Sequence, residues 1–200
     1  MGIKDITYAA LFDRKDLPFL YRYAEKVRAT HSQQLVDDFN NACQRKVDDH
    51  NPILGDRTEF MQVSKADDLV VTVGITRLIL QITGGSLVRW QWMAKGGGST
   101  TPSAADAGLT AEVGGASDPR IDMSLFGWRE WAGSSLRFLA ISGESVPTIT
   151  VNEAGIFDTG PLAGGTMLNK NVFSSLPITH TVNVTGFVIS SVIDFVPVMN

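Results

Sequence analysis

VPTITVNEAGIFDTGPLAGGTMLNKNVFSSLPITHTVNVTGFVISSVIDFVPVMN, the stretch from Val146 to Asn200, decides the fold class of this chain. It is rich in Val, Ile, Thr and Phe, with glycine and proline between the apolar runs, which predicts several short β-strands. Only four of its 55 residues are charged, namely Glu153, Asp158, Lys170 and Asp194. A soluble domain usually has about a quarter of its residues charged. We therefore expect other copies or other proteins to cover much of its surface.

Charge is unevenly divided along the 200 residues. Residues 1–68 contain 22 charged side chains, whereas the 132 residues of 69–200 contain 16. This decrease in the density of charged residues predicts two regions, an N-terminal helical arm at 1–54 and a β domain at 55–200. The formal net charge of −4 argues against a protein whose main role is to bind nucleic-acid phosphates.

A long amphipathic helix is predicted from Asp16, which is a suitable N-cap residue and is followed by Pro18 in the first turn. The helix should end before Asn51-Pro52, because the residue before a proline disfavours the helical conformation. A break is expected near Thr30–Ser32. One face of the helix is formed by Leu20, Ala24, Val27, His31, Leu35, Phe39, Ala42 and Lys46. A helix of this length suits a lever or a clasp on a neighbouring subunit.

After Gly55 the apolar pattern changes to a period of two, which is typical of strands. Further strands are expected at Leu69–Ile75, Arg77–Ile82, Ser86–Ala94, Ile121–Phe126, Leu136–Ser142, Thr148–Asn152, Gly155–Phe157, Met167–Phe173 and Thr179–Val198. A hairpin turn is expected at Gly84-Gly85 and a β-bulge at Gly186. The predicted fold is mainly β, an antiparallel β-sandwich of jelly-roll type with the N-terminal helix attached.

The segment from Lys95 to Asp118 is rich in Gly, Ser, Thr and Ala. Such a composition predicts a flexible loop, and loops of this length often have a function. Two interpretations stay open: a mobile surface loop, or an arm that becomes ordered on a partner subunit.

No catalytic, cofactor or metal site is predicted. The three histidines are far apart, and neighbouring residues of Asp48-Asp49-His50 point in different directions on a helix. Cys43 lies beside the apolar face of the helix and is expected to be buried and inert. A hydrolase remains an alternative, since four carboxylates are available in the β region: Glu130, Glu144, Glu153 and Asp158.

Four tryptophans, Trp90, Trp92, Trp128 and Trp131, allow two interpretations. They fill the core or a subunit interface, or they form an aromatic platform on which a sugar ring stacks.

Residues 152–173 resemble a segment of tailed-bacteriophage structural proteins of the tail-fibre, collar and neck type. In that family an E-x-G-(I/L)-F-(D/N) strand and turn precede a G-x-x-(L/M) strand and a V-F pair. The matching residues here are Glu153, Gly155, Ile156, Phe157, Asp158, Gly165, Met167, Leu168, Val172 and Phe173. The chain departs from the family in its final strand, VISSVIDFVPVMN, where family members often have a Trp-Thr-Ile-Thr pattern.

The resemblance and the low charge together predict a non-enzymatic virion structural protein of the neck, tail or fibre-attachment region. It is expected to form a homo-oligomer and to contact other virion proteins. Nucleic acid is not an expected partner, and no membrane insertion is expected. The protein is expected to be made in the host cytoplasm without a signal peptide. The expected interface residues are Ile156, Phe157, Val172, Phe173, Phe187 and Phe195. The alternatives are a carbohydrate-binding or receptor-binding adhesin and a head decoration protein.

Overall fold

The computed structural model describes residues 2–51, 53–55, 57–82, 89–113, 120–132, 134–142, 149–162, 164–173, 178–180 and 185–196. The described residues form mainly β-structure with three α-helices and one 3-10 turn. The helical elements are η1 (Arg14–Asp16), α1 (Leu17–Thr30), α2 (Gln33–Val47) and α3 (Thr72–Ile82). The strands are β1 (Gly2–Asp13), β2 (Ile53–Leu54), β3 (Thr58–Val70), β4 (Trp92–Gly96), β5 (Glu112–Val113), β6 (Ile121–Asp122), β7 (Gly127–Ala132), β8 (Ser135–Ser142), β9 (Ile149–Val151), β10 (Glu153–Phe157), β11 (Met167–Val172), β12 (Ile178–His180) and β13 (Thr185–Val196).

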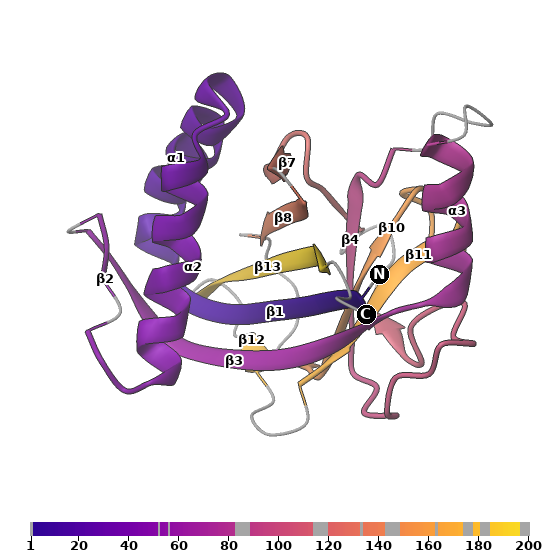
Figure 1. Ribbon diagram of the computed structural model, residues 1–200. Helices are drawn as coiled ribbons and strands as arrows, with labels where there is room; N and C mark the ends of the chain where they lie inside the picture. Colours follow the sequence, from indigo (N-terminus) through magenta and orange to yellow (C-terminus); the bar gives the residue numbers. More distant parts are fainter. Residues whose placement is uncertain are drawn as a thin grey trace.

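The sheet consists of two antiparallel parts that share one strand, β3. The first part contains β2, β3, β1, β13, β8 and β7, and the second contains β5, β6, β4, β10, β11 and β3. In Figure 1, β1, β3 and β13 run across the picture, while β4, β10 and β11 rise at one end of them. The predicted mainly β, antiparallel fold is therefore confirmed.

A common hydrophobic core joins the two parts of the sheet. Its buried side chains come from β1, β3, β8 and β13 of the first part and from β4, β10 and β11 of the second. Leu11, Phe187 and Ile189, for example, belong to the same cluster as Met93, Ile156 and Leu168. The sheet therefore curls so that both parts contribute to one interior.

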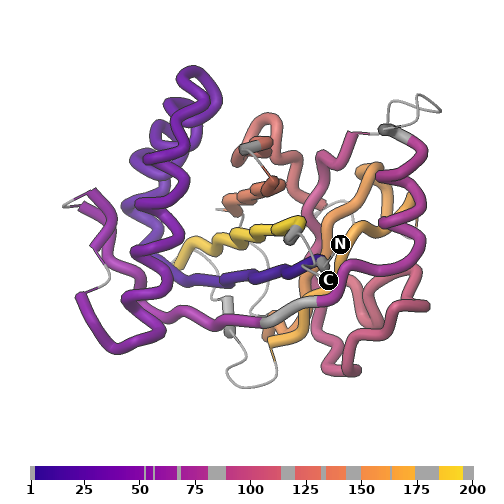
Figure 2. The backbone as a smooth tube through the Cα atoms, viewed as in Figure 1, coloured from indigo at the N-terminus to yellow at the C-terminus, as the bar shows by residue number. Residues whose placement is uncertain are grey.

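The first strand lies in the middle of the sheet. β1 pairs along its whole length with β13, from Gly2↔Val196 to Asp13↔Thr185, and β3 pairs with its other edge. Because Gly2 is opposite Val196, the two ends of the described chain lie side by side (Figure 2). The predicted boundary at residue 54 stays a prediction, but β1, from the N-terminal side of it, is fully integrated into the sheet.

Two helices replace the single long one. α1 ends at His31, whose φ of 50° places it in the left-handed region, and α2 begins after Ser32, whose hydroxyl accepts from the Leu35 amide at 3.4 Å. The predicted start at Asp16 and the break near Thr30–Ser32 are thus confirmed. The break shifts the buried face, so that Val36 and Cys43 are buried while His31 is exposed.

Both N-terminal helices cover the outer face of the first part of the sheet (Figure 1). They share a second hydrophobic cluster with side chains of β1, β3, β7, β8 and β13. Phe39 of α2 is its centre, because its ring contacts those of Phe60 and Trp128 at centroid distances of 5.5 and 5.3 Å. The helices therefore bury their apolar faces against their own chain.

The strands predicted at Leu69–Ile75 and Arg77–Ile82 are wrong over most of their length, because residues 72–82 form α3. β3 does continue to Val70. Beyond it, Val71, Ile75 and Leu78 recur at steps of four and three, so a helix turns these apolar side chains toward the interior. Tertiary packing of this stripe outweighs the strand propensity of Val and Ile. The predicted turn at Gly84-Gly85 lies outside the described residues.

Three further details differ from the predictions. Of the strand expected at Ser86–Ala94, residues 86–88 lie outside the described structure, residues 89–91 are not in a strand, and β4 begins at Trp92; β6 stops at Asp122. Gly186 forms no bulge, because the register between β1 and β13 is uninterrupted. A glycine is needed there because an added Cβ would collide with the Phe12 ring.

No helix of the described part of the chain is long and apolar enough to span a membrane.

Candidate functional site

Most of the residues predicted to form a subunit interface lie inside their own chain. Ile156 and Phe187 are 0% exposed, and Phe157 and Phe173 are 1% exposed. Side chains this deeply buried complete the monomer core, which leaves Val172 and Phe195 as the partly exposed members of the predicted set.

The four tryptophans lie in different environments. Trp128 is 1% exposed under the N-terminal helices, and Trp92 packs beside Gly160 in a small third cluster. Trp90 is 6% exposed and belongs to the common core, whereas Trp131 is 61% exposed. Trp90 and Trp131 line a common pocket, whereas Trp128 and Trp92 pack in two other clusters, so the four do not form one platform.

This pocket, called here the Trp131 pocket, has a volume of 250 Å³. It lies between the β7–β8 hairpin and the segment that precedes β4. Its lining residues are Arg89, Trp90, Arg129, Glu130, Trp131, Leu136 and Phe138.

Strand alternation on β7 and β8 determines which side chains reach the Trp131 pocket. Arg129 is paired with Phe138, and Trp131 with Leu136, and successive side chains of a strand point to opposite faces. Trp128 and Leu139 therefore point to the opposite face, where both join the cluster under the helices. Phe195 of β13 stacks on Trp131 with ring centroids 6.1 Å apart and planes 17° apart.

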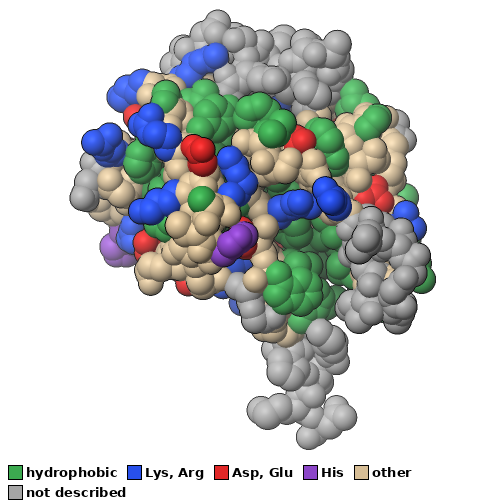
Figure 3. Space-filling view, turned by 90° about the horizontal axis from the view of Figure 1, so that it is seen from above, with side chains coloured by type: hydrophobic (Ala, Val, Ile, Leu, Met, Phe, Trp, Pro, Cys, Tyr) green, Lys and Arg blue, Asp and Glu red, His purple; other side chains and the backbone are tan. Residues whose placement is uncertain are grey.

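The Trp131 pocket has an excess of unpaired positive charge. Neither Arg89 nor Arg129 has a hydrogen-bond or ion-pair partner among the described residues. The carboxylate of Glu130 is already engaged, because its Oε2 lies 2.9 Å from Nδ1 of His31. The indole nitrogen of Trp90 is buried and also has no partner among the described residues. Figure 3, which views the molecule from above Figure 1, shows Lys and Arg side chains lying among hydrophobic ones on that face.

Arg120, a buried arginine elsewhere in the fold, differs from the two arginines of the Trp131 pocket because its guanidinium already has partners. The guanidinium of Arg120 pairs with Glu112 at 2.6 and 2.9 Å and donates to the carbonyls of Thr159 and Gly164. Its Cζ also lies 3.6 Å from the centroid of the Phe157 ring. The 290 Å³ pocket beside it therefore offers no uncommitted cation.

The open edge of β3 is the second candidate site. β3 pairs with β1 over residues 60–68, but its other edge pairs with β2 only at Thr58 and Glu59 and with β11 only at Leu69 and Val70. Between those points no described strand occupies this edge. A groove of 410 Å³ runs here, called the β3 groove, and it is lined by Lys46, Val47, Met61, Gln62, Val63, Ser64 and Lys65.

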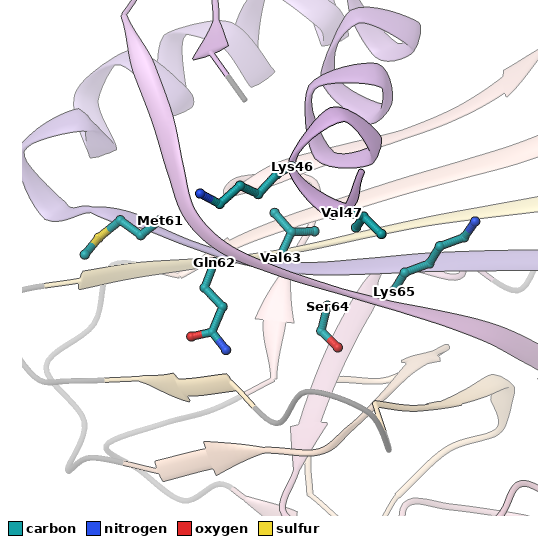
Figure 4. Close-up of a pocket in the computed structure, with 7 residues that line it drawn as sticks. All are labelled: Lys46, Val47, Met61, Gln62, Val63, Ser64 and Lys65. Carbon is teal, nitrogen blue, oxygen red and sulfur yellow. The ribbon is translucent and has the colours of Figure 1, made fainter. Parts of the chain in front are cut away.

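Figure 4 shows how side chains alternate along the β3 groove. Val63 lies on the side of α2, near Lys46 and Val47, whereas Gln62 and Ser64 point to the other side of the strand. Met61 is 54% and Val47 39% exposed, so apolar surface is accessible beside the two lysines.

The predicted loop at Lys95–Asp118 is fixed over much of its length. Its first two residues belong to β4, and Glu112–Val113 forms β5. The buried carboxylate of Glu153 accepts from the amides of Gly98, Thr110 and Ala111 at 3.2, 3.0 and 2.7 Å. An added Cβ at Gly96 or Gly98 would lie 2.6 or 2.5 Å from Glu153 Oε1, which explains glycines in this segment. Residues 114–119 lie outside the described structure.

Lys170 also contacts the segment that Glu153 holds in place. Its Nζ lies 3.8 Å from Glu153 Oε2, 3.1 Å from Asp106 Oδ2 and 2.8 Å from Thr110 Oγ1. Glu153 and Lys170 are 0% and 1% exposed, so two of the four charges of the C-terminal stretch serve inside the molecule.

The residues considered for catalysis do not converge. The described part of the chain holds no group of three potential metal ligands. Asp158 accepts from the Thr166 amide at 2.7 Å, while Glu130 and Glu153 have the separate partners given above, and Glu144 lies outside the described residues. Cys43 is fully buried, and burial raises the pKa of its thiol. The side chain of His180 is not described.

The sequence predictions did not include the two arginines of the Trp131 pocket. A signal existed in GWREWA, where strand alternation would place Arg129 and Trp131 on one face. Arg89 had no such signal, because its position depends on how the two parts of the sheet curl.

Comparison of the chain with family models, curated proteins and solved structures finds no match in any of the three. Conclusions about function therefore rest on its sequence and geometry.

Proposed function

We propose that this protein is a non-enzymatic structural subunit of a bacteriophage virion, in the neck, tail or fibre-attachment region. It forms a homo-oligomer and contacts other virion proteins, and the β3 groove is the surface through which it assembles. The observation that supports this proposal is the open edge of β3 between residues 60 and 68.

Backbone chemistry makes such an edge a docking surface. In an antiparallel pair, the amides and carbonyls of a strand point alternately toward its two neighbours. About half of these groups in the middle of β3 therefore face the open edge. An extended segment of another subunit can add there as a further strand, with backbone hydrogen bonds for affinity and side-chain contacts for specificity.

The side chains of the β3 groove favour one kind of incoming strand. Lysines on an edge strand discourage unspecific pairing, because a charge is costly to bury without a partner. Lys46 and Lys65 line this groove together with the accessible apolar groups of Val47 and Met61. A segment that alternates apolar and acidic side chains would satisfy both, so we assign the groove to a neighbouring subunit's segment of that composition.

The curled sheet also supports a more specific description of the fold. We infer that the two parts of the sheet correspond to the two layers of the predicted jelly-roll-like sandwich. The support is the shared core, which takes side chains from both parts.

Assembly can be tested by placing a charge in the β3 groove. Met61→Glu changes a 54% exposed side chain and should leave the monomer folded while it abolishes self-association. Leu125→Glu is the matched control, because Leu125 is 61% exposed and lies outside the groove. Light scattering of the purified proteins measures the mass. A monomeric wild-type protein at high concentration, or equal assembly of both variants, would contradict the proposal.

A carbohydrate- or receptor-binding adhesin is the second candidate function. The Trp131 pocket favours it, because it is lined by one exposed tryptophan and by two arginines that have no partner among the described residues. Glycan binding that disappears in Trp131→Ala, with the fold retained, would support this second function.

A further inference from the structure

We propose that the Trp131 pocket binds a single sugar ring that carries a carboxylate, such as a uronic acid or a sialic acid residue. This inference rests on the second candidate function and names the class of its ligand. It does not depend on assembly through the β3 groove.

Trp131 provides the stacking surface. Phe195 lies parallel to its indole, and the side chain still remains 61% exposed. The exposed indole is amphipathic and flat, and it is backed by another ring that limits its rotation. The apolar face of a pyranose can stack on such a surface at a low cost in side-chain entropy.

The two arginines provide the charge selectivity. Arg89 and Arg129 line the same pocket, and neither is paired with a described residue. A guanidinium matches the geometry of a carboxylate and forms two parallel charge-assisted hydrogen bonds with it. Glu130 offsets only part of this charge, because the pocket holds two guanidinium groups and one carboxylate, and that carboxylate lies 2.9 Å from His31 Nδ1. A neutral sugar offers hydroxyl oxygens as acceptors but no negative charge to pair with the two guanidinium groups.

The size of the pocket accommodates about one sugar residue. Its 250 Å³ is below the roughly 300–1,000 Å³ typical of sites for drug-sized molecules. Leu136 and Phe138 form an apolar part of the lining, so a ring fits better than an extended anionic chain. A terminal residue of a glycan meets these conditions.

Binding is measured by titration calorimetry with the methyl glycosides of glucuronic acid and N-acetylneuraminic acid. The corresponding methyl esters keep the ring but remove the charge, and 6-sulfated galactose tests a different anion. We expect at least one of the two acids to bind about tenfold or more tightly than its ester, with a loss of affinity as salt rises.

Variants locate the binding in the pocket. Trp131→Ala and Arg129→Gln should each weaken the acid about tenfold or more, while the matched controls Leu125→Ala and Arg22→Ala should not. Leu125 is as exposed as Trp131, at 61%, and Arg22 is an exposed arginine of α1. If Trp131→Ala proves unfolded by circular dichroism, Arg129→Gln decides the question.

Each other result would overturn the inference in a recognisable way. Equal binding of acid and ester, or binding of the sulfated sugar alone, would refute the carboxylate and leave a glycan-binding protein. Absence of binding to any glycan would refute the second candidate function as well. The light-scattering experiment on Met61→Glu reports separately on assembly.

Discussion

Asn169 on β11 donates a hydrogen bond from Nδ2 to Oδ2 of Asp5 on β1, with 2.7 Å between the two atoms. The residues are 164 positions apart and belong to different parts of the curled sheet. Ser191 of β13 donates to the other carboxylate oxygen at 3.1 Å. The Asn169 side-chain oxygen accepts from the Ile156 amide at 3.1 Å. A small buried polar network therefore links the first strand, β1, to β10 and β11 within residues 152–173.

The first prediction concerns the pH dependence of this network. Burial raises the pKa of Asp5 from 3.8 to about 7; hydrogen bonds from Asn169 and Ser191 oppose this shift, and the nearby charge of Asp194 adds to it. Between these two pKa values the folded state binds more protons than the unfolded state. The free energy of unfolding should therefore fall as pH rises from about 4 to 7 and then level off.

Asp5→Asn keeps the geometry but removes the titration. It should raise the free energy of unfolding relative to wild type at pH 8, by up to ~4 kcal/mol, with a smaller gain at pH 5. Urea unfolding at both pH values measures the difference. The exposed Asp48→Asn is the control. Equal destabilisation by Asp5→Asn at both pH values would show that the network requires the ionised carboxylate.

The second prediction concerns the segment held by Glu153. Glu153→Ala leaves three amides without their acceptor and removes one of the two carboxylates near Lys170. Removing one partner of a buried charge pair typically costs about 3–5 kcal/mol. We expect a loss of stability of that order and faster proteolysis within residues 97–113.

The exposed Glu25→Ala serves as its control. An unchanged cleavage rate in Glu153→Ala would mean that Glu153 does not hold the segment. The same contacts predict that deletion of residues 95–118 impairs folding, since Glu153 and Lys170 would be left buried without these partners.

The third prediction concerns the contact between α3 and β11. A Cβ at Gly74 would lie 2.5 Å from the carbonyl oxygen of Leu168. Gly74→Ala should therefore destabilise the protein by about 1–3 kcal/mol, the usual range for overpacking, even though alanine favours a helix by up to ~1 kcal/mol over glycine.

Gly108→Ala is the matched substitution, because an added Cβ there meets nothing within 4 Å. Thermal unfolding of both variants provides the comparison. If Gly74→Ala were more stable than wild type, residues 72–82 would not pack on β11 as a helix.

Local patterns were sufficient to predict much of the secondary structure. The start of α1 after Asp16, the break near Thr30–Ser32 and the alternation of β3 all follow from neighbouring residues, because they depend on local backbone chemistry. Local patterns gave a wrong prediction for residues 72–82, which form a helix and not strands. Their β-branched side chains suit a strand as well as a buried helix, and only the place of Val71, Ile75 and Leu78 against the core separates the two.

The candidate sites were less predictable than the elements. Trp131 was selected from its residue type, but its partners Arg89 and Phe195 are 42 and 64 positions away along the chain. The β3 groove had no sequence signal, because an edge is open only when no other strand pairs with it.

The sequence by itself determined that this chain is mainly β, that a helical region with a break near Thr30–Ser32 begins at Asp16, and that the stretch from Val146 to Asn200 has few charges. Those properties follow from residue type and local period. The tertiary structure alone decided where the scarce charges lie. Glu153 and Lys170 are buried as a pair, and Asp5 meets Asn169 across the curled sheet, because strand order brings distant residues together. Because Glu153 and Lys170 are buried, the surface of the stretch has even fewer charges than its composition indicates, and this is the surface that we propose other subunits cover.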